Sequence, residues 1–321
     1  MQIGKTIALL TALSAASAPV RAHSSVYCYQ SSAGVKGGGS MKVSSFRIIV
    51  EQEHSESACR AIILSDNGQE IFRLQDWSVD VVPVTGKDIN GEGHPDAVLE
   101  SFSGGAHCCW TYFVVSLTDK GGLIRKFENR TPASFEDLSH NGTVDLVTQD
   151  GAFDEFEGLP HPFSPFPTIV LRLNRDKFED VSKEFWPVYE KKIEQVRRDI
   201  KTSELERFIR SKPAEVHDDL DYLRTESAVL TVILEFLYGG RPEEAWKALG
   251  ELWPSDDRER IRHAIINEYC GGLRSDLSLP LGPLCQAGSA GGAPFGFGFG
   301  GWSTLVGRTG LGQRVPHSLR I

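Results

Sequence analysis

The spacing of apolar residues changes near Trp186, and this change most constrains what the chain can fold into. Before Trp186, short β-rich runs recur roughly every ten residues, with Asp-Asn-Gly or Asn-Gly turn signals between them. Runs of this kind are typical of an all-β unit. The runs cover residues 46–50, 61–64, 79–84, 97–99, 111–117, 143–147 and 168–173.

After Trp186, apolar residues recur at intervals of three and four, as they do on one face of a helix. Ile193, Val196 and Ile200 follow this spacing, and a more apolar helix is expected over residues 220–238. The sequence therefore predicts an α+β fold, with an N-terminal all-β unit followed by a small all-α helical domain.

The first residues have the pattern of a secretory signal peptide. Lys5 supplies a positive start, residues 7–16 form an apolar run, and residues 20–22 form a small-residue cleavage site. We therefore expect an exported protein, either periplasmic or extracellular. No later run reaches the roughly 18 apolar residues that a bilayer crossing requires, so no membrane span is expected after cleavage.

These patterns divide the chain into four expected segments. Residues 1–22 are the signal peptide, 23–185 the β domain and 186–285 the helical domain. Residues 286–321 form a Gly-rich tail, which we expect to be disordered because it cannot bury enough apolar surface to offset the entropy of ordering.

The net charge is −9 at pH 7, and cleavage would remove two positive charges, those of Lys5 and Arg21. An acidic surface argues against binding nucleic acid through phosphate contacts. It suits a solvated exported protein or one that collects cations.

All six cysteines follow the expected cleavage site, and an even number in an exported chain predicts disulfides. Cys270 and Cys285 are close in sequence within a Gly/Pro-rich stretch, so we pair them first. Two further cysteines, Cys28 and Cys59, pair either with each other or with the neighbours Cys108 and Cys109.

The segment from Asp88 to Asp96 has an oxygen-bearing residue at every second position, as a calcium loop requires. Asp88, Asn90 and Glu92 can converge on one ion, His94 can offer its backbone carbonyl, and Asp96 can complete the shell. Calcium is favoured over magnesium because it accepts six to eight oxygens in a loose geometry. The loop precedes an apolar strand rather than a helix, which argues against an EF-hand.

A second copy of this pattern lies 49 residues further along the chain and also precedes an apolar run. Two copies with the same internal spacing are stronger evidence than one, because a single Asp/Asn/Gly run is usually just a turn. The second copy has fewer carboxylates than the first. Its candidate ligands are Asp137, Ser139, Asn141, Thr143 and Asp145.

The pattern Asp-x-Asn-Gly-x-Gly-x-x-Asp, followed by apolar residues, resembles the calcium loops of FG-GAP/VCBS-type repeats. Such repeats occur in integrin α-subunit propellers and in many exported bacterial proteins. The resemblance covers about residues 45–185 and implies blade-like β repeats with calcium loops between strands, serving adhesion, ligand binding or structural support. It also implies calcium ligation by Asp88, Asn90, Glu92 and Asp96 in the first loop, and by Asp137, Ser139, Asn141 and Asp145 in the second.

Two residues depart from the family pattern, since Glu92 replaces the usual Asp and His140 replaces the first Gly of the second copy. The chain also has room for only two or three blades, whereas a closed propeller needs at least four. We therefore expect an incomplete, sandwich-like β unit, or else assembly with another chain.

Residues 151–167 form a long connection rich in proline and phenylalanine. Loops of this length are usually functional or disordered. Phe153, Phe156, Phe163 and Phe166 could form a binding surface, or they could fold back as a lid on the β core.

These features favour an exported calcium-binding protein with a binding or structural role and an unidentified protein or glycan partner. The alternatives are a metal-dependent secreted hydrolase and a structural subunit of a larger envelope assembly. The sequence has no nucleophile elbow, His-Glu-x-x-His helix, phosphate loop or nucleotide-binding glycine fingerprint.

Overall fold

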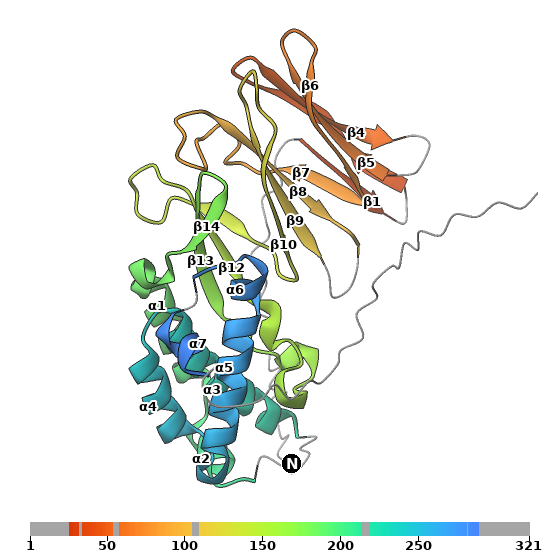
Figure 1. The fold of residues 1–321 in the computed structure, drawn as a ribbon. Helices are drawn as coiled ribbons and strands as arrows, with labels where there is room; N and C mark the ends of the chain where they lie inside the picture. The colour runs from red at the N-terminus through yellow and green to blue at the C-terminus, as the bar shows by residue number, and fades with distance from the viewer. Residues whose placement is uncertain are drawn as a thin grey trace, which may run out of the picture.

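The computed structural model of the protein describes residues 26–31, 34–53, 58–104, 109–212, 219–280 and 282–288. The expected signal peptide, Cys108 and residues 289–321 lie outside these described residues. Within them the fold is α+β, with three antiparallel sheets followed by a helical region, as the sequence predicts (Figure 1).

In the residues that the structure describes, the β part consists of fourteen strands in three sheets. They are β1 (Tyr27–Ser31), β2 (Gly34–Gly37), β3 (Gly39–Val43), β4 (Phe46–Glu53), β5 (Ala58–Ser65), β6 (Glu70–Asp76), β7 (Ser78–Val81), β8 (Asp96–Phe102), β9 (Trp110–Ser116), β10 (Leu123–Asn129), β11 (Ser134–Glu136), β12 (Asp145–Gln149), β13 (Thr168–Asn174) and β14 (Lys177–Asp180).

Strands β3 to β14 form three successive four-stranded antiparallel meanders. The first is β3–β6 and the third is β11–β14, each a sheet of its own. The second is β7–β10, which β1 and β2 extend to a six-stranded sheet with the order β10-β9-β8-β7-β1-β2. Each acidic loop joins the first strand of a meander to its second, because one lies between β7 and β8 and the other between β11 and β12.

Alternation of apolar and polar residues sets the buried face of the outer strands. In β4, Phe46, Ile48 and Val50 are buried while Arg47 is exposed. In β8 and β9 the apolar residues are continuous, and both faces of these strands are buried. The six-stranded sheet therefore packs on both sides.

Two hydrophobic cores use the two faces of this sheet. One face contributes Leu99 and Val115 to a core with the β3–β6 sheet, and the disulfide between Cys28 and Cys59 joins these two sheets. The other face contributes Val98 to a larger core with β11–β14 and the helices. The β part is thus a packed stack of sheets rather than a closed ring.

The helices gather at one end of the molecule, next to the β11–β14 sheet (Figure 1). Short 3₁₀ helices are η1 (Gly151–Phe153), η2 (Phe156–Gly158), η3 (His161–Phe163), η4 (Ser182–Phe185) and η5 (Ser255–Asp257). The α-helices are α1 (Trp186–Asp199), α2 (Thr202–Ile209), α3 (Leu220–Tyr238), α4 (Pro242–Leu252), α5 (Arg258–Gly271), α6 (Leu273–Asp276) and α7 (Pro283–Gly288).

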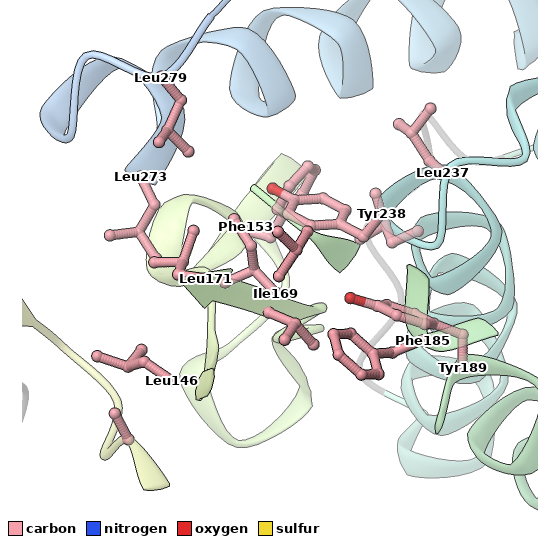
Figure 2. Close-up of a cluster of buried hydrophobic side chains, with 14 of the residues drawn as sticks. Leu146, Phe153, Ile169, Leu171, Phe185, Tyr189, Leu237, Tyr238, Leu273 and Leu279 are labelled. Carbon is pink, nitrogen blue, oxygen red and sulfur yellow. The ribbon is translucent and has the colours of Figure 1, made fainter. Parts of the chain in front are cut away.

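The larger core is continuous from the third meander into the helices (Figure 2). Ile169 and Leu171 of β13 lie beside Phe153 of η1, Tyr189 of α1 and Tyr238 of α3 in this cluster. The helical region therefore shares its core with the β11–β14 sheet.

Buried polar contacts also tie the helices to this sheet. Glu235 of α3 accepts a hydrogen bond from the backbone N–H of Thr168 at 3.1 Å and pairs with Lys192 of α1 at 2.5 Å. Asp150, which follows β12, accepts hydrogen bonds from Tyr238 Oη at 2.8 Å and from the backbone N–H of Leu273 at 3.2 Å.

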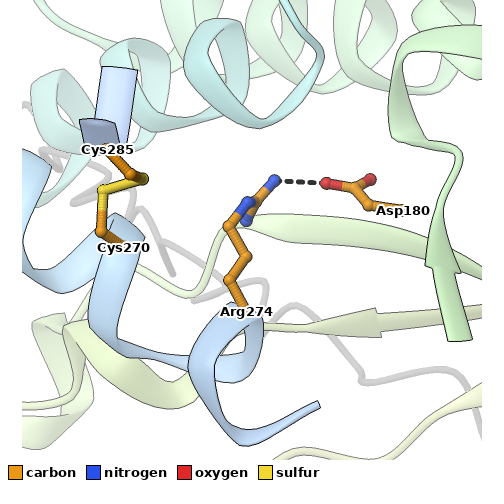
Figure 3. Close-up of a disulfide and its surroundings, with 4 residues drawn as sticks. All are labelled: Asp180, Cys270, Arg274 and Cys285. Carbon is orange, nitrogen blue, oxygen red and sulfur yellow. Dashed lines mark hydrogen bonds and ion pairs between the residues drawn. A yellow bond between two sulfur atoms is a disulfide. The ribbon is translucent and has the colours of Figure 1, made fainter. Parts of the chain in front are cut away.

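Arg274 of α6 completes these contacts (Figure 3). Its guanidinium pairs with Asp180 of β14 at 2.5 Å and lies 3.9 Å from the ring centre of Tyr269. The disulfide between Cys270 and Cys285 holds α7 against α5. Helix α7 continues to Gly288, past the expected start of the Gly-rich tail at residue 286.

None of the described helices combines the length and hydrophobicity that crossing a membrane requires. Disulfides such as Cys28–Cys59 and Cys270–Cys285 are typical of proteins that fold in an oxidising compartment.

Candidate functional site

The first acidic loop is closed by its own side chains. Asp88 accepts hydrogen bonds from the backbone N–H groups of Gly91 and Gly93, each at 2.8 Å. Asp96, the first residue of β8, accepts one from the N–H of Ile89 at 2.8 Å. Gly91 and Gly93 have φ values of 77° and 84°, which glycine adopts without steric cost. The backbone path is therefore fixed, with a carboxylate at each end.

Negative charge gathers in this loop without a basic partner. Asp96 is 1% exposed, and burial raises its pKa to about 6. The charges of Asp88 and Glu92 raise this pKa further, while the N–H of Ile89 opposes the rise. Over the residues that the structure describes, no ion pair joins Asp88, Glu92 or Asp96 to a lysine or arginine. The electrostatics of the loop favour a cation.

The second acidic loop repeats the backbone of the first. Asp137 accepts hydrogen bonds from the N–H groups of Asn141 at 3.0 Å and Gly142 at 2.8 Å. The N–H of Gly142 is the main reason that the pKa of Asp137 is lowered. His140 and Gly142 have φ values of 54° and 91°, at the positions of the two left-handed glycines of the first loop. His140 therefore keeps the conformation in spite of its side chain.

The two loops differ at the carboxylate that ends each of them. Asp145 begins β12 as Asp96 begins β8, and it is 0% exposed. Its Oδ1 accepts a hydrogen bond from Nε of Arg172 at 2.8 Å, and a second guanidinium nitrogen lies at 2.8 Å. Burial raises the pKa of Asp145 and Arg172 lowers it. The second loop thus has a cation of its own, supplied by the protein.

The two loops lie at the same small cleft, which has a volume of about 270 Å³. The backbone N–H of Arg175 donates to the carbonyl of Asn90 at 2.8 Å and so joins the β13–β14 turn to the first loop. The lining comprises Asp88, Ile89, Asn90, Gly91, Gly142, Thr143, Arg172, Leu173 and Asn174.

The donors of the first loop fit a hard cation. A carboxylate oxygen has two lone pairs, so the backbone hydrogen bonds of Asp88 and Asp96 leave acceptor capacity free. Asn90 is buried with its Oδ1 within the loop, 3.2 Å from the N–H of Glu92, whereas Glu92 and His94 are exposed. Three or more His, Cys, Asp or Glu side chains do not converge anywhere in the described residues. An ion would therefore be held by Asp88, Asp96, the Asn90 amide and backbone oxygens.

In the second loop the remaining candidate ligands are more open. Ser139 and Asn141 are exposed, and Thr143 donates its backbone N–H to Asn141 Oδ1 at 2.8 Å. With Asp145 held by Arg172, only Asp137 adds a carboxylate without a basic side chain bound to it.

A second, larger cleft of about 1220 Å³ lies between β10, the η1–η2 segment and helices α5 and α6. Figure 1 shows α5 and α6 beside the end of β10, which is an edge strand of the six-stranded sheet. One face of α5 lines it with Ala264, Asn267, Glu268 and Gly271.

Charges of both signs line this cleft. Arg125 and Lys126 come from β10, whereas Glu268 and Asp276 come from α5 and α6. Burial raises the pKa of Glu268, and the charge of Asp150 adds to the rise. Within the described part of the chain, neither Arg125 nor Glu268 makes an ion pair, and Nε of Arg125 is buried without a hydrogen-bond partner.

The phenylalanines of the 151–167 connection fold onto the protein. Phe153 and Phe156 are buried, and their rings pack at 5.1 Å between centres. Phe153 also packs on Tyr238. Both residues belong to the hydrophobic core, and Phe156 also lines the larger cleft. Phe163 and Phe166 are half-buried.

The cysteines follow one of the pairings left open by the sequence. Cys28 pairs with Cys59, and Cys270 pairs with Cys285, with Cα–Cα distances of 5.6 and 5.7 Å. Cys109 is disulfide-bonded as well.

Reasoning from the sequence missed Arg172, Arg125 and Glu268. Nothing local marks Arg172, because its contact with Asp145 depends on which residues of β12 and β13 lie opposite each other. Glu268 comes from a helix that is distant in sequence from β10, so no sequence spacing relates it to Arg125.

Comparison with protein-family models, with curated proteins and with solved structures gives no match for this chain.

Proposed function

We propose that this chain is an exported calcium-binding repeat protein in which one ion, held by the first acidic loop, stabilises the β part. The observation that carries this proposal is the difference between the two loops. They share left-handed backbone at the same two positions, yet the second has Arg172 beside its buried aspartate while the first has no basic partner. A cation from solvent would supply the missing charge.

Calcium fits this loop better than a transition metal because the available donors are carboxylate, amide and backbone oxygens. Asp88, Asn90 and Asp96 would hold it, with the exposed Glu92 and the carbonyl of His94 available to complete the shell. The bound ion would supply positive charge that offsets the repulsion between Asp88, Glu92 and Asp96. Its place between two strands of a meander supports the resemblance to FG-GAP/VCBS-type repeats.

The proposal is tested by calcium titration of residues 23–321, using calorimetry together with melting curves in calcium and in chelator. We expect saturable binding and a higher melting temperature in calcium. Asp88→Ala should reduce calcium affinity by at least the ~10-fold that loss of an outer-shell partner costs at a metal site.

Asp66→Ala is the matched control, because Asp66 lies in an Asp-Asn-Gly turn outside both loops and pairs with Lys42 on the surface. It should leave calcium affinity unchanged. Absence of binding to the wild type, or equal affinity in Asp88→Ala, would refute the calcium site.

A second candidate function, binding of an extended peptide, is favoured by the larger cleft. No further strand pairs with the outer edge of β10 among the described residues, so its backbone groups are available for β-strand addition. Arg125 and Glu268 offer opposite charges that the fold does not pair. A mixed-charge peptide would satisfy both.

A fluorescence-polarisation screen of mixed-charge decapeptides would test this function. Glu268→Gln and Arg125→Gln should each weaken binding of any hit about 10-fold or more, since each removes one charge-assisted contact. Lys247→Gln, on the exposed face of α4, serves as the control. Equal binding by all variants, or no hit in the screen, would rule out this use of the cleft.

A further inference from the structure

The strand register of the β8–β9 and β12–β13 hairpins explains why the second acidic loop has a basic side chain beside its buried aspartate and the first does not. In the second meander Asp96 of β8 lies opposite Ser116 of β9. In the third meander Asp145 of β12 lies opposite Arg172 of β13. The buried aspartate that ends each acidic loop therefore faces a neutral residue in one case and a guanidinium in the other.

We infer that Arg172 replaces the metal ion in the second loop, so that this copy is an ion-independent version of the first. The family resemblance implies calcium ligands in both loops, and the second does not fit that expectation. Arg172 approaches Asp145 through two nitrogens at 2.8 Å and also pairs with Glu184 at 3.1 Å. Its guanidinium also lies over the ring of Phe185, 5.9 Å from the ring centre.

One carboxylate oxygen of Asp145 could still bind a metal ion if Arg172 were replaced. Oδ2 of Asp145 is buried and has no hydrogen-bond partner, while both contacts to Arg172 use Oδ1. Together with Asp137 it supplies the two carboxylates that this loop keeps. Replacing Arg172 with a neutral residue should therefore turn the second loop into a calcium site.

This inference rests on the proposed function in one respect, namely that loops with this backbone take calcium. The test uses the Asp88→Ala chain, in which the first loop is disabled, so that any calcium effect must come from the second. In that background Arg172→Met should raise the melting temperature in calcium over that in chelator by about 3 °C or more. Arg172→Lys keeps the positive charge and should remain insensitive to calcium.

A reciprocal pair of single variants keeps the test decisive if the double variant does not fold. Asp137→Ala in the otherwise unchanged protein should leave calcium affinity and stoichiometry as they are. Ser116→Arg places a guanidinium opposite Asp96 and should abolish calcium binding by the first loop.

The outcomes separate this inference from the proposed function. Weaker calcium binding by Asp137→Ala, or equal calcium responses of Arg172→Met and Arg172→Lys in the Asp88→Ala background, would overturn the inference alone. A wild-type protein that binds no calcium would overturn the proposed function, while a response of the Arg172→Met chain would still uphold the inference.

Discussion

At the scale of single residues, the charged side chains that the fold removes from solvent form two groups. Some have a partner of opposite charge, and others have none. Asp145, Glu235 and Arg274 each have one, whereas the buried Asp96 and the half-buried Glu226 have no ion-pair partner in the described part of the chain. Burying a charge without a partner favours its neutral form. The ionisation of Asp96 and Glu226 should therefore make the stability of the fold depend on pH.

Glu226 of α3 gives the clearest case. Burial raises its pKa to about 7, and the charges of Asp257 and Glu157 add to the rise. The folded state therefore binds this proton more tightly than the unfolded state does. The contribution to stability is present at low pH and is lost as pH rises from 4.5 through about 7.

Glu226→Gln should accordingly stabilise the protein at pH 8, by up to about 3 kcal/mol, and have little effect at pH 4.5. Urea unfolding at the two pH values measures this difference. Glu251→Gln, at an exposed position of α4, provides the control. An effect of Glu226→Gln that is the same at both pH values would contradict the assignment.

The sequence predicts both acidic loops, but it does not predict that only the second has an arginine beside its buried aspartate. Alternating oxygen-bearing residues mark both loops in the sequence because the ligands of a loop are local. The contact between Asp145 and Arg172 is not local, since it spans 27 residues and depends on strand register. A shift of the register by one residue would point Arg172 to the other face of the sheet.

At the scale of elements, the sequence predicts the central strands and misses the edges. Each of the seven apolar runs overlaps one of the strands β4, β5, β7, β8, β9, β12 and β13, and each of these strands has neighbours on both sides. Six of the seven strands without a run are the edge strands β2, β3, β6, β10, β11 and β14. Edge strands are short or charged because an apolar edge would invite aggregation, and so they lack the pattern that identifies strands.

The sequence predicts helix α3 with its bounds because its signals are local. Its apolar residues cover residues 220–238, Asp219 caps the N-terminus through the N–H of Asp221, and Gly239 ends the helix. Helix α6, of four residues, carries no such signal. Its position is set instead by Arg274, which fixes it to the β14 strand.

Arg274→Met should destabilise the protein by about 3 to 5 kcal/mol, because it leaves Asp180 without its buried partner and removes the packing on Tyr238 and Tyr269. Arg274 is 5% exposed, so solvent cannot replace the contact. Urea denaturation measures the loss. Arg207→Met, which removes exposed ion pairs on α2, should cost much less stability than Arg274→Met. Similar losses for the two variants would show that Arg274 is not an anchor.

At the scale of the whole molecule, the division into a β part and a helical part follows from the period of apolar residues. The change near Trp186 coincides with the end of η4 and the start of α1. The sequence did not reveal that the helices and the third meander share one core. That core depends on contacts such as Glu235 with Thr168, which lie 67 residues apart.

The six-stranded sheet gives one face to each core, and this has a consequence for dividing the chain. A cut before β7 would remove the β3–β6 sheet and leave Leu99 and Val115 facing water. A cut after β10 would remove the third meander and the helices and expose Val98 and Tyr112 on the opposite face. Neither cut yields two fragments that fold on their own, because the six-stranded sheet contributes to both hydrophobic cores.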